Sequence, residues 1–150
     1  MGKTLMIGSC EPFSGKSALV LGIAKQIILS KKEVRFGKPL ATSLELISSF
    51  DKTCDYIIDD DVRFVGETLG LTEDQLIASV ELLAASTADK RLSESEIRTG
   101  KGFQLLKNKL NHSFDGINIL EAAGSLHEGL LYGLSLVQLA KDLNANVLLV

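Results

Sequence analysis

The residues whose types and spacing most clearly indicate a chemical function are Ser14 to Ser17, Ser-Gly-Lys-Ser, near the start of this 150-residue chain. They follow an apolar run, Thr4 to Ile7, and precede an amphipathic run, Ala18 to Leu29. A strand, a glycine-bearing loop and a helix in this order form the context in which Gly-Lys-Ser indicates a phosphate-binding loop. Backbone N–H groups can surround an anion there, and the start of the helix adds a positive dipole end. We therefore predict phosphate contacts from Phe13, Ser14, Gly15, Lys16 and Ser17.

Two side chains of this loop have specific predicted roles. Lys16 can reach the outer phosphates of a nucleotide, and the Ser17 hydroxyl is placed to ligate Mg²⁺. The loop departs from the usual pattern, because Cys10 stands where that pattern has a glycine and Pro12 stiffens the backbone. The alternative interpretation is a chance Gly-Lys-Ser at a helix start. The flanking strand and helix favour the phosphate-binding interpretation.

The composition indicates one α/β domain. The chain has the length of an ordinary domain and can bury about 70% of its unfolded surface. It is 45% hydrophobic but only 5% aromatic and contains no tryptophan. A core built mostly of Leu, Ile, Val and Ala suits a parallel sheet that helices cover on both faces.

Charge and hydropathy exclude several classes of partner. The formal net charge of −3 leaves no surplus of basic residues for nonspecific nucleic-acid binding. No apolar run approaches the roughly 20 residues of a membrane span. The first residues already have the character of a strand rather than of a secretory signal, so a cytoplasmic location is the expectation. The two cysteines fit neither a disulfide framework nor a zinc site.

Alternating apolar segments predict a doubly wound, mainly parallel sheet in a three-layer α/β/α arrangement. Strands are expected at residues 4–8, 34–40, 117–121 and 147–150, the second stopping near Lys38 because Pro39 cannot continue the ladder. Helices are expected at residues 18–29, 59–70, 73–85, 103–110 and 136–143. The polar residues 86–102 are expected to form an exposed loop. Because the sequence ends on an apolar strand, we expect residues 1–150 to be one domain in the N-terminal part of a longer chain.

Three polar clusters follow predicted strand ends. They are Ser14 to Ser17 after the first strand, Lys38 to Ser43 after the second, and Glu121 to Ser125 at the end of the third. In open parallel sheets, ligands bind beyond the carboxyl ends of the strands. The three clusters are therefore expected to converge on one site.

Two acidic residues are candidate Mg²⁺ ligands. Glu121 closes an otherwise apolar strand, and a half-buried carboxylate there needs a partner. Asp61 belongs to the run Asp59 to Asp61, whose adjacent like charges are costly unless a cation is near. The alternatives are a Glu121 paired with a lysine or facing solvent, and an aspartate cluster that only caps a helix and compensates its dipole.

Lys38 is a candidate catalytic cation together with Lys16. Lys38 stands between Gly37 and Pro39 at the end of the second strand. Such a lysine can face the phosphates or a carboxylate substrate. The alternative is a surface lysine on an edge strand.

The motifs together resemble the dethiobiotin synthetase-like P-loop domains, a group that includes cobyrinate diamide synthases. Within that group the chain is most similar to the N-terminal domain of phosphotransacetylase and related phosphotransacetylase-like proteins. The resemblance runs from Thr4 to Val150. It is carried by five motifs: Gly8-Ser-Cys-Glu-Pro-Phe-Ser-Gly-Lys-Ser17, Phe36-Gly-Lys-Pro-Leu40, Asp59-Asp-Asp-Val-Arg-Phe64, Glu121-Ala-Ala-Gly-Ser125 and Gly133-Leu-Ser-Leu-Val-Gln-Leu-Ala-Lys141.

This resemblance implies a nucleotide-binding fold with ATP on the loop, a contact from Gly124, and Mg²⁺ held by Ser17, Asp61 and Glu121. It also implies that Lys38 faces a substrate and the transferred phosphate. In the synthetases a carboxylate or carbamate attacks the γ-phosphate, and a second nucleophile closes the mixed anhydride. The synthetases tend to be homodimers, so the resemblance adds a homodimer to the expectations.

The departures from the synthetase motifs shift the functional hypothesis. Cys-Glu-Pro-Phe replaces a loop of the Thr-Asp-Thr type, and Glu-Ala-Ala-Gly-Ser replaces Glu-Gly-Ala-Gly-Gly. By resemblance, phosphotransacetylase-like proteins use this domain for ligand sensing, and we expect no acetyltransferase domain within residues 1–150. The first hypothesis is therefore a regulatory or weakly hydrolytic Mg²⁺–ATP-binding domain. The alternatives are an ATP-dependent ligase that activates a small carboxylate, and an interaction module without nucleotide binding; the sequence leaves open whether the domain is an enzyme.

Overall fold

The computed structural model describes residues 3–43, 57–84, 101–111 and 114–150. Within these residues, one sheet has the strand order β4-β2-β6-β1-β7, and all of its pairings are parallel. The strands are β1 (Lys3–Gly8), β2 (Val34–Gly37), β4 (Leu76–Ile77), β6 (Ile117–Glu121) and β7 (Asn146–Leu149). The predicted mainly parallel sheet is thus confirmed, with the four predicted strands in it and β4 added.

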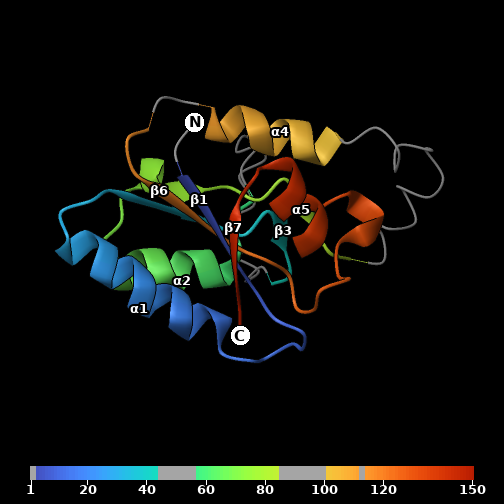
Figure 1. Ribbon diagram of the computed structural model, residues 1–150, viewed down its shortest axis with the longest axis horizontal. Coiled ribbons are helices and arrows are strands. Elements are labelled where there is room, and N and C mark those ends of the chain that lie inside the picture. The colour runs from blue at the N-terminus through green and yellow to red at the C-terminus, as the bar shows by residue number, and fades with distance from the viewer. Residues whose placement is uncertain (1–2, 44–56, 85–100, 112–113) are drawn as a thin grey trace, which may run out of the picture.

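Helices cover both faces of this sheet (Figure 1). On one face lie α1 (Lys16–Leu29) and α2 (Asp60–Leu69), and on the other lie α4 (Lys101–Leu110) and α5 (Leu136–Asp142). In the first core, Val20 and Val65 pack with Phe36 of β2. In the second core, Leu106 and Leu139 lie in one cluster with Met6 of β1 and Leu120 of β6. The three-layer α/β/α arrangement is therefore confirmed.

The two central strands supply both cores. Met6 and Leu120 are buried in the core under α4 and α5, whereas Ile7 and Ile119 are buried in the core under α1 and α2. Successive side chains of a strand point to opposite faces, so a strand covered on both sides must be apolar at consecutive positions. This is why β1 has apolar residues at the consecutive positions Leu5 to Ile7, and β6 at Ile119 and Leu120.

The helix ends follow the predicted local signals. Asp59 caps α2, and its carboxylate accepts from the Asp61 N–H at 2.9 Å. Gly70 ends the same helix in the left-handed conformation that glycine adopts without steric cost. Ser135 begins α5 with a reciprocal capping box, in which Gln138 Oε1 accepts from the Ser135 N–H at 3.1 Å. No helix within the described ranges is long and apolar enough to cross a bilayer.

The helix expected at residues 73–85 is wrong. The stretch contains a single 3₁₀ turn, η1 (Glu73–Gln75), followed by the strands β4 and β5 (Glu81–Leu82), the latter parallel to β3 (Leu40–Ala41). Leu76 pairs with Phe36 and contributes to the first core, whereas Ile77 contributes to the second. Neighbouring residues serve opposite faces of the sheet, which a strand allows and a helix does not. Pairing with β2 therefore overrides the helical spacing.

The remaining predictions of segments have mixed outcomes. The second strand ends at Gly37, next to Lys38 as predicted, and the chain resumes extended structure at Leu40. Of the loop expected at residues 86–102, residues 86–100 lie outside the described part of the chain. Residues 101 and 102, which were expected in this loop, are helical and belong to α4.

Candidate phosphate-binding site

The loop between β1 and α1 contains two residues in the left-handed backbone conformation. Phe13 has φ of 58° and Gly15 has φ of 89°. A Cβ atom on Gly15 would meet nothing within 4 Å, so the backbone conformation rather than space favours glycine there. Backbone N–H groups in such alternating conformations can point into one concavity and bind an anion. The Phe13 side chain points away from the fold and is fully exposed.

Lys16 is folded back over this loop. Its ammonium donates to Ser9 Oγ at 2.9 Å and to the Gly124 carbonyl at 3.2 Å, and the residue is only 7% exposed. The Ser9 hydroxyl also lies 2.9 Å from the Gly124 carbonyl. These neutral oxygens hold the ammonium without cancelling its charge. A buried cation with neutral partners gains strongly from an anionic oxygen, which is what a phosphate provides.

Ser17 and Glu121 meet at the ends of β1 and β6. The register pairs Ile7 with Glu121, so the residues that follow β1 lie beside the end of β6. The Ser17 hydroxyl lies 3.3 and 3.4 Å from the two carboxylate oxygens of Glu121. A hydroxyl and a carboxylate are oxygen ligands of the kind that Mg²⁺ takes.

Glu121 is only 2% exposed, and this burial raises its pKa to about 7. The positive charges of Lys38 and Lys16 and the hydrogen bond from Ser17 lower the pKa, whereas the negative charge of Asp61 raises it. The carboxyl group therefore holds a proton more readily than an ordinary glutamate does. A divalent cation beside it would favour the ionised form.

Lys38 is buried just after the carboxyl end of β2, on the same side of the sheet as Glu121. It is 4% exposed, which excludes the alternative of a surface lysine. Its ammonium donates to Asp61 Oδ2 at 2.7 Å and to Thr42 Oγ1 at 2.5 Å, and it lies 3.3 Å from Asp59 Oδ2. Burial alone would lower the pKa of Lys38, but the hydrogen bond to Asp61 and the charges of Asp59, Asp61 and Glu121 raise it above its ordinary value. The structure therefore favours the charged form of Lys38.

The structure brings the predicted site residues together. Glu121 interacts electrostatically with Lys16, Lys38 and Asp61, and it contacts Ser17 directly. Gly124 follows β6 and contacts the loop, because its carbonyl accepts from Lys16. A Cβ atom at Gly124 would lie 2.5 Å from Glu128 Oε2, so the flexible Glu128 side chain would have to move aside. The functional roles of these residues stay predictions, but their convergence at one sheet edge is a property of the fold.

Oxygen atoms of the kind that Mg²⁺ binds are present among the predicted site residues. Ser17, Glu121 and Asp61 offer a hydroxyl and two carboxylates, the hard donors that suit this ion. Among the described residues, no three His, Cys, Asp or Glu side chains cluster closely enough to hold a metal by themselves.

Two residues of the site were not singled out from the sequence. Ser9 accepts from Lys16, and it could have been suspected only because it belongs to the loop motif. Asp59 was interpreted as a helix cap, which is correct, but its carboxylate also faces Lys38.

Ser14, a predicted phosphate contact, has a buried hydroxyl without a hydrogen-bond partner.

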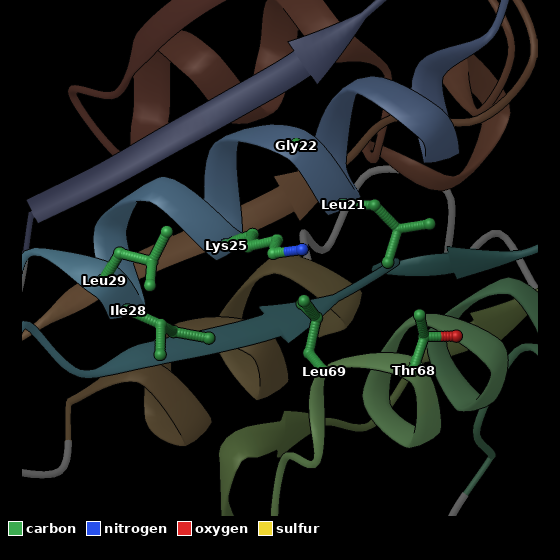
Figure 2. A pocket seen from close by; sticks show the side chains of 7 residues that line it. All are labelled: Leu21, Gly22, Lys25, Ile28, Leu29, Thr68 and Leu69. Atoms are coloured by element: carbon green, nitrogen blue, oxygen red, sulfur yellow. The ribbon is translucent and has the colours of Figure 1, made fainter.

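A separate apolar groove lies between α1 and α2 (Figure 2). It has a volume of about 450 Å³, and none of the predicted site residues contributes to it. Its lining comes from Leu21, Gly22, Lys25, Ile28, Leu29, Thr68 and Leu69. Neither Lys16 nor Ser17, at the N-terminal end of α1, reaches this groove, so it does not belong to the loop site.

A strand, a curled loop with a buried lysine and a helix, at the edge of a parallel sheet, define a P-loop domain of the nucleotide-binding class. The model of a family described as an AAA domain matches residues 3–150, and the chain belongs to this family, which includes the dethiobiotin synthetase-like P-loop NTPases. A comparison with curated proteins finds no significant match.

Proposed function

We propose that this chain binds Mg²⁺–ATP on the loop from Phe13 to Ser17, as a regulatory or weakly hydrolytic domain of a phosphotransacetylase-like protein. The observation that carries the proposal is the contact between Ser17 and Glu121, at 3.3 Å, beside the buried Lys16. This contact supports the proposal because Ser17 and Glu121 together would hold a divalent ion, whose charge would stabilise the phosphates of the nucleotide.

Each residue has a role in this proposal. The N–H groups of the loop hold the phosphates, and Lys16 exchanges a neutral oxygen partner for a phosphate oxygen. Gly124 lets the backbone of the neighbouring loop approach the nucleotide. Ser17, Glu121 and Asp61 would hold Mg²⁺, which would neutralise charge on the phosphates.

The test is calorimetric titration of the whole chain with ATP, with Mg²⁺ and with a chelator. We expect binding that Mg²⁺ strengthens, and that Lys16→Ala abolishes at millimolar ATP. Lys25→Ala is a matched control, because Lys25 is an exposed lysine on the same helix outside the site. A folded protein that does not bind millimolar Mg²⁺–ATP would overturn the proposal and favour an interaction module.

The buried position of Lys38 favours a second candidate, an ATP-dependent ligase that activates a small carboxylate. A buried lysine whose charged form is favoured can stabilise the transferred phosphate. The ligase hypothesis requires phosphate release that depends on a small acid and is lost in Lys38→Ala. If phosphate release is the same with and without every acid tried, the regulatory or weakly hydrolytic domain is the better proposal.

A further inference from the structure

Two carboxylates share the Lys38 ammonium, and they differ in how firmly they are held. Asp59 is completely buried, whereas the side chain of Asp61 is 43% exposed. The shorter contact is nevertheless the one with Asp61, at 2.7 Å, against 3.3 Å for Asp59. The exposed carboxylate is thus the closer partner of the buried lysine.

Asp59 is fixed by backbone donors on both of its oxygens. Its Oδ2 accepts from the N–H groups of Thr42 at 2.7 Å and Ser43 at 3.1 Å. Its Oδ1 accepts from the N–H group of Asp61 at 2.9 Å, as the cap of α2. One buried carboxylate therefore joins the segment after β3 to the start of α2. Three backbone amides therefore hold Asp59 in its place beside Lys38.

The Asp61 carboxylate has two possible cationic partners, Lys38 and the proposed Mg²⁺. In the protein alone its carboxylate binds Lys38, and in the proposed complex it would bind Mg²⁺. When Asp61 turns to the ion, Lys38 loses its closest anion while it remains buried. A buried charge without a counter-charge is strongly unfavourable. Asp59, which stays in place, supplies the remaining counter-charge.

We propose that Asp59 is a positioning residue that holds Lys38 and so leaves Asp61 available for Mg²⁺. This inference rests on the proposed function and adds to it a division of labour between two neighbouring aspartates. Asp59 keeps the lysine neutralised in both states, and Asp61 moves between lysine and metal. Without the Asp59 charge, Lys38 would retain Asp61.

The measured quantity is the Mg²⁺ enhancement, defined as the dissociation constant of ATP in chelator divided by that in Mg²⁺. We expect Asp59→Asn to reduce this enhancement about tenfold or more. Binding of ATP without metal should not weaken, because Lys38 is then less neutralised. A role in stability alone would lower the melting temperature without changing this ratio.

Asp60→Asn is the matched control. Asp60 lies on the same helical turn, accepts from Ser43 Oγ at 2.7 Å and carries the same charge, but it makes no ion pair with Lys38 among those the structure gives. We expect its Mg²⁺ enhancement to stay within about twofold of the original protein. Equal losses in Asp59→Asn and Asp60→Asn would overturn the inference, since a general loss of negative charge would then explain both.

A second comparison keeps the test decisive if Asp59→Asn does not fold. Lys38→Met removes the competing cation, and the double variant Lys38→Met/Asp59→Asn removes both buried charges together, which folded proteins often tolerate. We expect these two variants to have the same Mg²⁺ enhancement within about twofold. A further loss on adding Asp59→Asn to Lys38→Met would show that Asp59 does not act through the lysine. If the original protein shows no Mg²⁺-dependent ATP binding at all, the proposed function fails, which is a different result from a failure confined to the Asp59 variants.

Discussion

The hydroxyl of Ser17 lies 3.3 Å from a carboxylate oxygen of Glu121, although the two residues are 104 positions apart in the sequence. Parallel pairing of β1 with β6 produces this contact, because it places the ends of both strands at one edge of the sheet. The contact leaves the Glu121 carboxyl group buried between the strand ends, where its protonation affects the stability of the protein.

Glu121→Gln should remove a pH dependence from the stability of the metal-free protein. The pKa of Glu121 is raised from 4.5 to about 7 in the folded state, so folding favours the protonated form. The resulting stabilisation is complete below about pH 4.5 and is lost as the pH rises through about 7. The loss corresponds to about 3 kcal/mol at most. Urea unfolding in chelator between about pH 5 and about pH 8 should show the variant gaining on the original protein as the pH rises. A difference that stays constant across this range would contradict the prediction.

Thr4→Val and Asn118→Val should each stabilise the protein by about 1 kcal/mol. Thr4 and Asn118 lie opposite each other in β1 and β6, both are buried, and neither side chain has a hydrogen-bond partner. Replacing an unsatisfied polar group with an apolar one removes its desolvation penalty. The check is the free energy of unfolding in urea. Destabilisation by either change would indicate that an ordered water satisfies the group.

Gly15→Ala and Gly22→Ala should have opposite effects on stability. A Cβ atom added to either glycine would meet no other atom within 4 Å, so space does not distinguish the two positions. Gly15 has φ of 89°, where alanine costs about 1–2 kcal/mol, whereas Gly22 lies inside α1, where alanine gains about 0.5–1 kcal/mol. Thermal unfolding measures both effects. The prediction fails if the two variants shift the melting temperature in the same direction.

Gly37→Ala should weaken the pairing of β2 with β4. A Cβ atom at Gly37 would lie 2.5 Å from both the Cβ and the carbonyl oxygen of Ile77, so the backbone would have to move. We expect a loss of about 1–3 kcal/mol in the free energy of unfolding. Gly102→Ala is the control, because its nearest contact would be an ordinary 3.4 Å to Leu134. Equal effects of the two changes would show that β4 adjusts to the added methyl group.

The sequence predicted most of the fold because the local and global signals agree. Apolar runs marked the strands that are buried on both faces, and the caps at Asp59 and Ser135 marked helix starts. The exception is the segment from Leu76 to Leu82. Its apolar residues have helical spacing, but Leu76 and Ile77 pair with β2 and join the sheet. This pairing depends on the position of β2 in the folded protein, which the local sequence does not show.

The site was predicted to a similar extent. Lys16 and Ser17 were evident from a local motif, and Lys38 and Glu121 followed from the rule that ligands bind beyond strand ends. The double role of Asp59 could not be predicted, because its backbone donors come from Thr42 and Ser43. A helix cap and a partner of a buried lysine have the same appearance in a sequence.

The outward position of Phe13 offers a direct optical readout. Its ring stands in solvent at the tip of the loop, and the sequence contains no tryptophan. Phe13→Trp would therefore give the chain a single indole, whose emission reports on the loop alone. Closure of the loop around an anion could then be followed in real time, without a label and without an indole signal from the core.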